Sequence, residues 1–242
     1  ATYDEAGHLY AGGVAFSNGY PTTSGAFQTT WGGAGSLISD IVVSKYDPGG
    51  STLIYSTYLG GDKTECPHSL IVDGNDNLII FGTTSSGNYP TSGSAFDNSF
   101  NGGSNVTTSG INYANGSDIV LTKLNSTGTG LVGSTFIGGS LNDGLNIGSA
   151  LVYNYGDNYR GDVTVDASNN YIVSTSTHSN DFPMFGGGTQ TSSGGDQDAV
   201  VFKMSSDLSS MIWSTYLGGI GFDAGYGIQI NNAGDLYVVG GT

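Results

Sequence analysis

The chain repeats one pair of segments three times. The three copies read DIVVSK (40–45) with YSTYLGG (55–61), DIVLTK (118–123) with GSTFIGG (133–139), and DAVVFK (198–203) with WSTYLGG (213–219). Each segment is short, rich in β-branched and aromatic residues, and bounded by Gly, Asn, Asp or Ser, which is typical of β-strands. The repetition therefore predicts a tandem array of small β-sheets.

Two further strands precede each pair. One contains a Leu-Tyr-like motif and reads GHLYAGG (7–13), DNLIIFGTT (76–84), NNYIVSTST (169–177) and GDLYVVGGT (234–242). The other has an Ile-x-Val-Asp pattern and lies at 69–73, 162–166 and 226–230. The turns from the first to the second strand and from the third to the fourth are rich in Asp, Asn and Gly, which favours tight antiparallel hairpins. Four antiparallel strands per unit predict the blade of a β-propeller.

The repeat divides the chain into three complete units and a partial one. The complete units are 1–61, 62–139 and 140–219, and residues 220–242 supply the first two strands of a fourth. We therefore predict an all-β fold with about three and a half propeller blades. Propellers close with about four to eight blades, and no signal peptide is recognisable at the start of the chain. We expect the chain to be part of a larger protein or assembly.

The spacing between motifs separates the rigid parts of the unit from the variable ones. The Leu-Tyr-like strand and the proline that follows it are always 12 residues apart, and the aspartate and the double glycine are always 20 apart. Two intervals vary: 19, 28 and 15 residues from the proline to the aspartate, and 18, 33 and 18 from the double glycine to the next Leu-Tyr-like strand. In an antiparallel quartet both variable connections leave on the same side. We predict that this side is the binding face.

The motifs resemble those of a known family. The Leu-Tyr-like strand, the loop YPTTSGAFQ (20–28), the DIVVSK-type strand and YSTYLGG are similar to the SBBP β-propeller repeat, over essentially the whole chain. The third unit departs from the pattern with FPMFGGGTQ (182–190), and the second carries two insertions. The resemblance implies a secreted or cell-surface protein of the kind found in Bacteroidota, often exported by type IX secretion and linked to adhesion or gliding. It implies no catalytic residues.

Composition narrows the class of partner. The 242 residues include 20 Asp and Glu against 5 Lys and Arg, a net charge of −15. Such a charge argues against a nucleic-acid partner, because phosphate binding needs a basic surface. No apolar run reaches the roughly 18–20 residues that span a bilayer, so we expect no direct membrane insertion. A single cysteine, Cys66, excludes an internal disulfide framework. We expect an extracellular or cell-surface location.

Residues that recur in every unit are expected to serve the fold. Three of the five basic residues occupy one repeat position, and three aspartates occupy another; we expect ion pairs or strand-end contacts from Lys45, Lys123, Lys203, Asp40, Asp118 and Asp198. The turn Asp73–Asn77 begins like a calcium loop, yet lacks that motif's later ligands, so we interpret it as a hairpin turn, with adventitious Ca²⁺ as the alternative. Asp62, Glu65, Cys66 and His68 fall in one variable loop, where we expect a tucked free cysteine rather than a metal site.

Nothing in the sequence predicts catalysis. The three histidines, at 8, 68 and 178, fall in turns or loops, and no serine lies in a nucleophile elbow. Arg160 is the single arginine, so a sialidase-type cluster is excluded, and two glutamates make a glycosidase pair unattractive. We predict a protein that is not an enzyme, with no catalytic residue, no metal site and no cofactor.

Aromatic residues of the variable loops are the candidate binding residues. They have no counterparts in the other units and are Trp31, Phe100, Tyr113, Tyr153, Tyr155 and Tyr159. Tyrosine and tryptophan combine a flat apolar face with a polar tip, which suits contacts with glycans or proteins. The competing interpretation is that they pin long loops onto the sheets.

The function predicted from sequence is a non-catalytic adhesion, scaffold or interaction module that binds a protein or glycan at the variable-loop face. One alternative is a structural spacer or a subunit of an extracellular filament, secretion or motility assembly. Another is the propeller part of a carbohydrate-active enzyme whose active site lies outside this segment.

Overall fold

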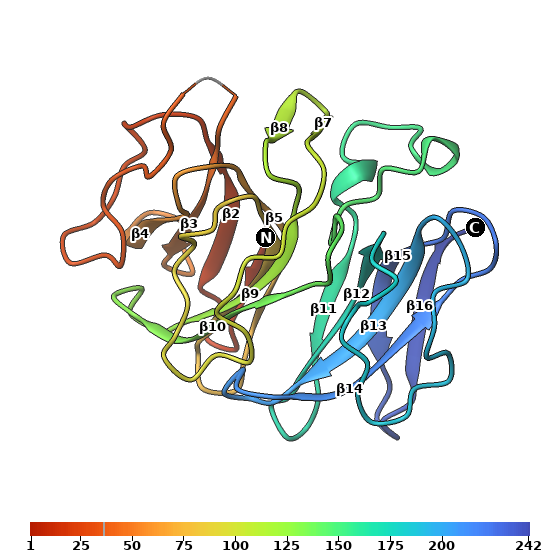
Figure 1. Cartoon of the computed structure of the whole chain (residues 1–242). Helices are drawn as coiled ribbons and strands as arrows, with labels where there is room; N and C mark the ends of the chain where they lie inside the picture. The colour runs from red at the N-terminus through yellow and green to blue at the C-terminus, as the bar shows by residue number, and fades with distance from the viewer. Residues whose placement is uncertain (36) are drawn as a thin grey trace.

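A computed structural model describes residues 1–35 and 37–242, and it is all-β (Figure 1). Three antiparallel four-stranded sheets follow one another along the chain, and the remaining strands pair as two-stranded hairpins. Two single 3₁₀ turns, η1 (Ser149–Leu151) and η2 (Asp157–Tyr159), are the helical segments of the described residues. Within that part of the chain, no helix has the length and apolar character needed to cross a membrane.

The strands follow the predicted order. The first sheet contains β1 (Thr2–Tyr3), β2 (Leu9–Ala15), β3 (Asp40–Tyr46) and β4 (Leu53–Leu59). The second contains β5 (Glu65–Val72), β6 (Leu78–Thr84), β9 (Asp118–Leu124) and β10 (Leu131–Ile137). The third contains β11 (Asp162–Val165), β12 (Tyr171–Thr177), β13 (Asp198–Met204) and β14 (Met211–Leu217). A final pair is β15 (Ala224–Ile230) with β16 (Leu236–Gly241), and an inserted hairpin, β7 (Val106–Thr108) with β8 (Ile111–Tyr113), separates β6 from β9. The predicted quartets of antiparallel strands are confirmed.

One sequence expectation was wrong at the start of the second unit. The first strand of that unit begins at Glu65, four residues before the predicted Ser69, so Glu65, Cys66 and His68 lie in β5 and not in a loop. Pro67 is tolerated because β5 is an edge strand and its pairing with β6 shifts register between Pro67 and Ser69. An edge strand at a bulge can lose one amide donor without breaking the ladder.

Successive sheets pack through their first strands and their faces. β1 contacts β5, β5 contacts β11, and β11 contacts β15. β6, β9 and β12 are buried along their whole length, because alternate side chains point to opposite faces and both faces are covered. Side chains of the first two sheets meet in one cluster that includes Tyr10, Val43 and Leu124. A larger cluster joins the second and third sheets.

The outer edge of each four-stranded sheet is covered by the connection between its second and third strands. Tyr58 of β4 donates its amide proton to the carbonyl of Gln28 at 2.9 Å, and Phe136 of β10 does the same to Asp97 at 3.1 Å. Each fourth strand also carries a register shift. Covered, bulged edges resist pairing with other chains.

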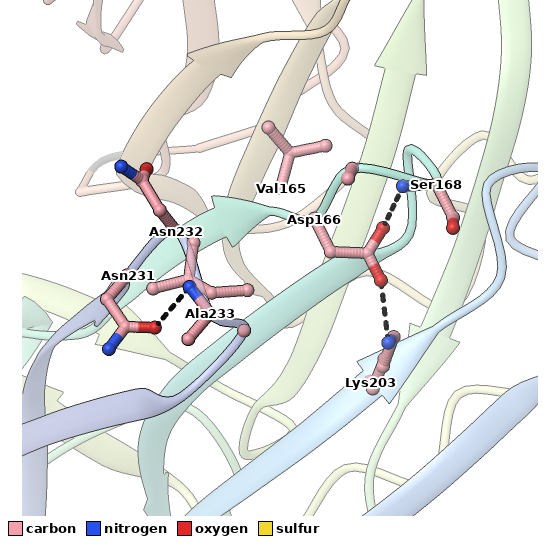
Figure 2. A pocket seen from close by; sticks show the side chains of 10 residues that line it. Val165, Asp166, Ser168, Lys203, Asn231, Asn232 and Ala233 are labelled. Atoms are coloured by element: carbon pink, nitrogen blue, oxygen red, sulfur yellow. Dashed lines mark hydrogen bonds and ion pairs between the residues drawn. The ribbon is translucent and has the colours of Figure 1, made fainter.

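The repeated lysines form ion pairs with aspartates at the ends of the first strands. The pairs are Lys45 with Asp4 at 3.3 Å, Lys123 with Asp73 at 2.8 Å, and Lys203 with Asp166 at 2.6 Å. Figure 2 shows the third pair, where Asp166 also accepts the Ser168 amide and the Asn231 turn of the next unit lies opposite. The second pair is the more enclosed, because Tyr171 of the next sheet donates its hydroxyl to Asp73 at 3.0 Å. The lysines therefore form ion pairs, one of the two contacts expected for them, whereas Asp40, Asp118 and Asp198 take part in none of the ion pairs of the described residues and instead accept loop amides.

Removing the ammonium group of Lys123 should destabilise the protein strongly. Both side chains of the Lys123–Asp73 pair are buried, so Lys123→Met leaves a buried carboxylate without its cation. We expect the free energy of unfolding to fall by about 3–5 kcal/mol. Lys63→Met is the matched control, since the Lys63–Asp62 pair is half-exposed and contributes less than about 1 kcal/mol. Urea unfolding of both variants at pH 7 measures the difference. Equal losses for the two variants would contradict the assignment.

Candidate binding site on the loop face

All the variable connections leave from one end of the strands. The segment after each double glycine begins the next unit beside the residue that precedes the third strand of the previous sheet, through the bonds Glu65 N to Ser39 O at 2.6 Å, Asp143 N to Ser117 O at 2.7 Å, and Asp223 N to Gln197 O at 2.7 Å. The tight hairpin turns therefore lie at the opposite end, since successive strands are antiparallel. We call the end with the variable connections the loop face.

Pairs of buried carboxyl groups lie just below this face. One member is the aspartate that begins each third strand, and its oxygens accept loop amides: Gly32 N bonds to Asp40 at 2.8 Å, and Asn101 N bonds to Asp118 at 2.7 Å. The other is an acid four residues after each double glycine, which accepts that glycine's amide: Glu65 from Gly61 at 3.0 Å, Asp143 from Gly139 at 2.7 Å, and Asp223 from Gly219 at 2.7 Å. The first carboxyl group thus holds the connection between the second and third strands, and the other holds the connection that follows the fourth strand.

Burial changes the chemistry of these carboxyl groups. Desolvation raises the pKa of Asp40 to about 6 and that of Asp118 to about 7, and it raises those of Glu65 and Asp143 to about 8. Gly60 separates Asp40 from Glu65 so closely that a Cβ there would lie 2.5 Å from Glu65 Oε2. The first glycine of the double glycine is thus required by the approach of two carboxyl groups.

Perturbed carboxyl pairs are a common sign of an active site, but the geometry of this pair recurs at each junction. The same arrangement occurs around Gly60, Gly138 and Gly218. A feature repeated in every unit serves the fold, and we assign the pairs to closing the loops. Within residues 1–35 and 37–242, no group of three or more His, Cys, Asp or Glu is placed to hold a metal ion.

The carboxyl pairs predict a fold that loses stability as the pH rises from about 4 to 8. Unfolded carboxyl groups ionise near pH 4, whereas Glu65 and Asp143 keep their protons to about pH 8 when folded. The folded state therefore binds more protons between these values, and each such group lowers the free energy of unfolding by up to about 1.4 kcal/mol per pH unit as the pH rises. Asp143→Asn, which mimics the protonated acid, should flatten this decline relative to the half-exposed control Asp62→Asn. Thermal melts from pH 5 to 8.5 measure it, and an unchanged slope in Asp143→Asn would count against the assignment.

In the turn that resembles a calcium loop, the Asp73 carboxylate bonds to other groups of the protein. Asp73 accepts the amides of Asn75 at 2.9 Å and Asn77 at 3.0 Å, in addition to its bonds with Lys123 and Tyr171. These contacts lower its pKa to about 2 against the opposing effect of burial. The carboxylate thus shapes a hairpin turn and holds it to the neighbouring sheet.

Four of the six predicted aromatic residues pack within the protein. Tyr113 is buried and its hydroxyl lies 2.9 Å from Thr83 Oγ1, so we leave it out of the candidate contact surface. Phe100 packs against Phe136 with ring centroids 6.0 Å apart. Trp31 is half-buried and its ring lies against Gly33. Tyr159 donates its hydroxyl to the carbonyl of Thr108 at 2.7 Å. These four rings pin loops, as the competing interpretation predicts.

The other two aromatic residues project from the loop face beside a groove. Tyr153 is 82 % exposed and Tyr155 is 88 % exposed. The groove is open, has a volume of about 650 Å³, and is lined by Thr107, Thr108, Ser109, Ile147, Ser149, Val152, Tyr153, Asn154, Tyr155 and Asn158. Its two walls are the β7–β8 hairpin and the segment between β10 and β11, which lie side by side at the top of Figure 1. No charged side chain is among these lining residues of the described chain.

Hydrogen bonds tie the two walls of the groove together. Ser109 Oγ donates to Asn158 Oδ1 at 3.0 Å, next to the bond from Tyr159 to Thr108. The Asn158 side-chain amide in turn donates to the carbonyl of Asn146 at 2.8 Å. The walls therefore form one structure, although 49 residues separate Ser109 from Asn158.

The tyrosine-bearing turn is braced from below. Asp157 accepts the amides of Tyr153 at 2.9 Å and Asn154 at 2.7 Å, and it pairs with Arg160 at 2.7 Å. The guanidinium of Arg160 lies 5.2 Å from the ring centre of Tyr226 in β15. These bonds hold the pKa of Asp157 near 2. A braced turn presents its tyrosines without the entropic cost of ordering a free loop on binding.

Gln197 is the supporting residue that the sequence analysis missed. Its side chain accepts the amides of Ile147 at 2.9 Å and Gly148 at 3.0 Å, and it donates to Asn146 at 2.9 Å. The equivalent residues in the first two units, Ser39 and Ser117, donate their hydroxyls to the carbonyls of Glu65 and Asp143. Gln197 makes the same contact with the carbonyl of Asp223 at 3.1 Å, and its longer side chain reaches the insertion as well. The replacement of serine by glutamine beside the longest insertion was a visible signal.

Comparisons with known proteins identify no relative of this chain. No family model matches it, and no curated protein matches it.

Proposed function

We propose that this chain is a non-catalytic interaction module of an extracellular protein, which binds a glycan or protein partner at its loop face. The observation that carries the proposal is the groove with Tyr153 and Tyr155, formed where the two longest insertions meet. Binding residues on loops held by a rigid scaffold are a common arrangement. The resemblance to the SBBP repeat, with its secretion and surface adhesion, supports the extracellular location.

We further propose that the four-stranded sheets are blades of a β-propeller. Support comes from the successive contacts of the first strands and from bonds between neighbours: Phe27 N donates to Gly128 O at 2.9 Å, and Phe96 N donates to Leu208 O at 3.0 Å. Thr189 has the same repeat position in the third unit, and within the described residues its amide makes no backbone hydrogen bond.

Exposed apolar side chains around the β15–β16 pair, the start of a fourth sheet, support the proposal that the chain is part of a larger protein or assembly. The cluster between the third sheet and β15–β16 contains three buried residues, against fifteen between the second and third sheets. Tyr237 and Val239 of β16 are more than 60 % exposed. A third and a fourth strand of the repeat, laid beside β16, would pair its free edge, and a further sheet would cover Tyr237 and Val239, so we propose that both are present in the complete protein. The same exposed face favours the second candidate function, a subunit of an extracellular assembly.

Completing the fourth sheet should stabilise the protein. Because Thr242 aligns with Ala15, residues 16–61 copied after Thr242 supply the missing connection and strands. We expect an increase in Tm of several degrees, at about 2–4 °C per kcal/mol gained. The control extension carries proline in place of the copied Val43, which removes a ladder hydrogen bond. Equal melting temperatures for both extensions would contradict the propeller proposal.

Binding should depend on the long insertion of the loop face. Deleting residues 146–160 shortens the 33-residue interval to 18, the value in the other units. We expect beads coated with the intact chain to adhere to glycan-coated or protein-coated surfaces and beads coated with the deletion variant to lose most of that adherence. Thermal unfolding of both proteins checks that the sheets are retained. Undiminished adherence of a folded deletion variant would refute a role for this insertion.

A further inference from the structure

The groove between the β7–β8 hairpin and the 147–158 segment has the chemistry of a site for uncharged sugars. We propose that it binds a neutral oligosaccharide, with Tyr153 and Tyr155 as stacking platforms. This inference rests on the proposed binding function and names the class of ligand. Its first support is the exposure of both rings, 82 % and 88 %, on a turn fixed by Asp157. Exposed apolar side chains that gather beside a groove are a mark of ligand-binding sites.

The rings suit a pyranose. The face of an aromatic ring carries a negative quadrupole, which attracts the polarised C–H groups on the flat side of a sugar. Tyr153 and Tyr155 are two residues apart on the same turn, so a chain of sugars can contact both. Tyrosine also loses little conformational entropy on binding, because it has two side-chain torsions.

Polar groups beside the rings are free to bind hydroxyls. The side chains of Asn154 and Ser149 line the groove and make no hydrogen bond within the described part of the chain. Amide and hydroxyl groups both donate and accept hydrogen bonds, as do sugar hydroxyls. Ser109 and Asn158, by contrast, bond to each other and shape the wall.

Charge and size argue against other occupants. The groove is uncharged and the whole chain carries −15, so sulfated, sialylated or uronic-acid glycans would be repelled, and Arg160 is already paired with Asp157. A protein partner needs about 1,200–2,000 Å² of interface with an apolar centre, whereas the apolar lining besides the tyrosines is Ile147 and Val152. A groove of about 650 Å³ is within the range of small-ligand sites.

The test is a binding measurement with defined oligosaccharides. The intact chain is titrated calorimetrically with neutral hexasaccharides of glucose (α1,4, β1,4 and β1,3) and of mannose, and with hyaluronan and heparin oligosaccharides as the anionic set. We expect at least one neutral probe to bind and neither anionic probe to do so. Tyr153→Ala and Tyr155→Ala should each weaken binding at least tenfold, and the double variant should abolish it. Because both rings are exposed, the melting temperature should stay the same.

Tyr3→Ala is the matched control, since Tyr3 is 76 % exposed and lies at the opposite end of the strands. It should bind like the unaltered chain. Preference for the anionic probes, no binding of any neutral probe, or neutral binding that survives both tyrosine substitutions would overturn this inference. If adherence to a protein-coated surface persists and depends on residues 146–160 while the sugars fail to bind, the proposed interaction function stands and the sugar assignment falls.

Discussion

Each four-stranded sheet has two apolar faces, and neither face can be buried without an adjacent sheet. The central strands β6, β9 and β12 are buried throughout because their alternating side chains enter the clusters on both sides. This mutual burial is the constraint on which the remaining structure depends. It sets the order of the sheets, brings the first strands into contact, and encloses ion pairs such as Lys123–Asp73 that would contribute little at an exposed surface.

The connections at the two ends of the strands are held in different ways. At the hairpin end the turns are short, and an aspartate in each complete unit pairs with the repeated lysine. At the loop face, Asp40 and Glu65 and their equivalents hold the connections by accepting backbone amides. These clamps need only a short segment on each side of the strand, so the residues between them can vary in number. The groove lies between two such insertions, and contacts between them make it rigid.

The stabilising framework and the proposed binding groove therefore lie in separate parts of this chain. The carboxyl pairs contribute buried protons and a dependence of stability on pH, and their repetition marks them as part of the framework. Tyr153 and Tyr155 contribute almost nothing to the core, because their rings are exposed. Residues that support the groove, such as Gln197 and Asp157, connect the two parts by holding an inserted segment to the framework.

The repeat predicts much of the framework and little of the site. Four strands in each complete unit, the antiparallel pairing and the lysine ion pair follow from motifs at constant spacing. The start of β5 did not, because Pro67 reads as a loop signal although an edge strand accepts it. The acid at Glu65 and its equivalents was also missed, although its spacing from the double glycine is constant.

The amino-acid sequence by itself determined the strand quartets and the face that carries the insertions, because strand alternation and turn chemistry are local properties that recur with the repeat. Only the tertiary structure decided which loop aromatics are buried and which project outward. Tyr113 and Tyr153 are indistinguishable as tyrosines in long loops, yet one is a buried residue of β8 and the other lies exposed on a braced turn. That difference arises from contacts between insertions distant in sequence, which no local pattern encodes.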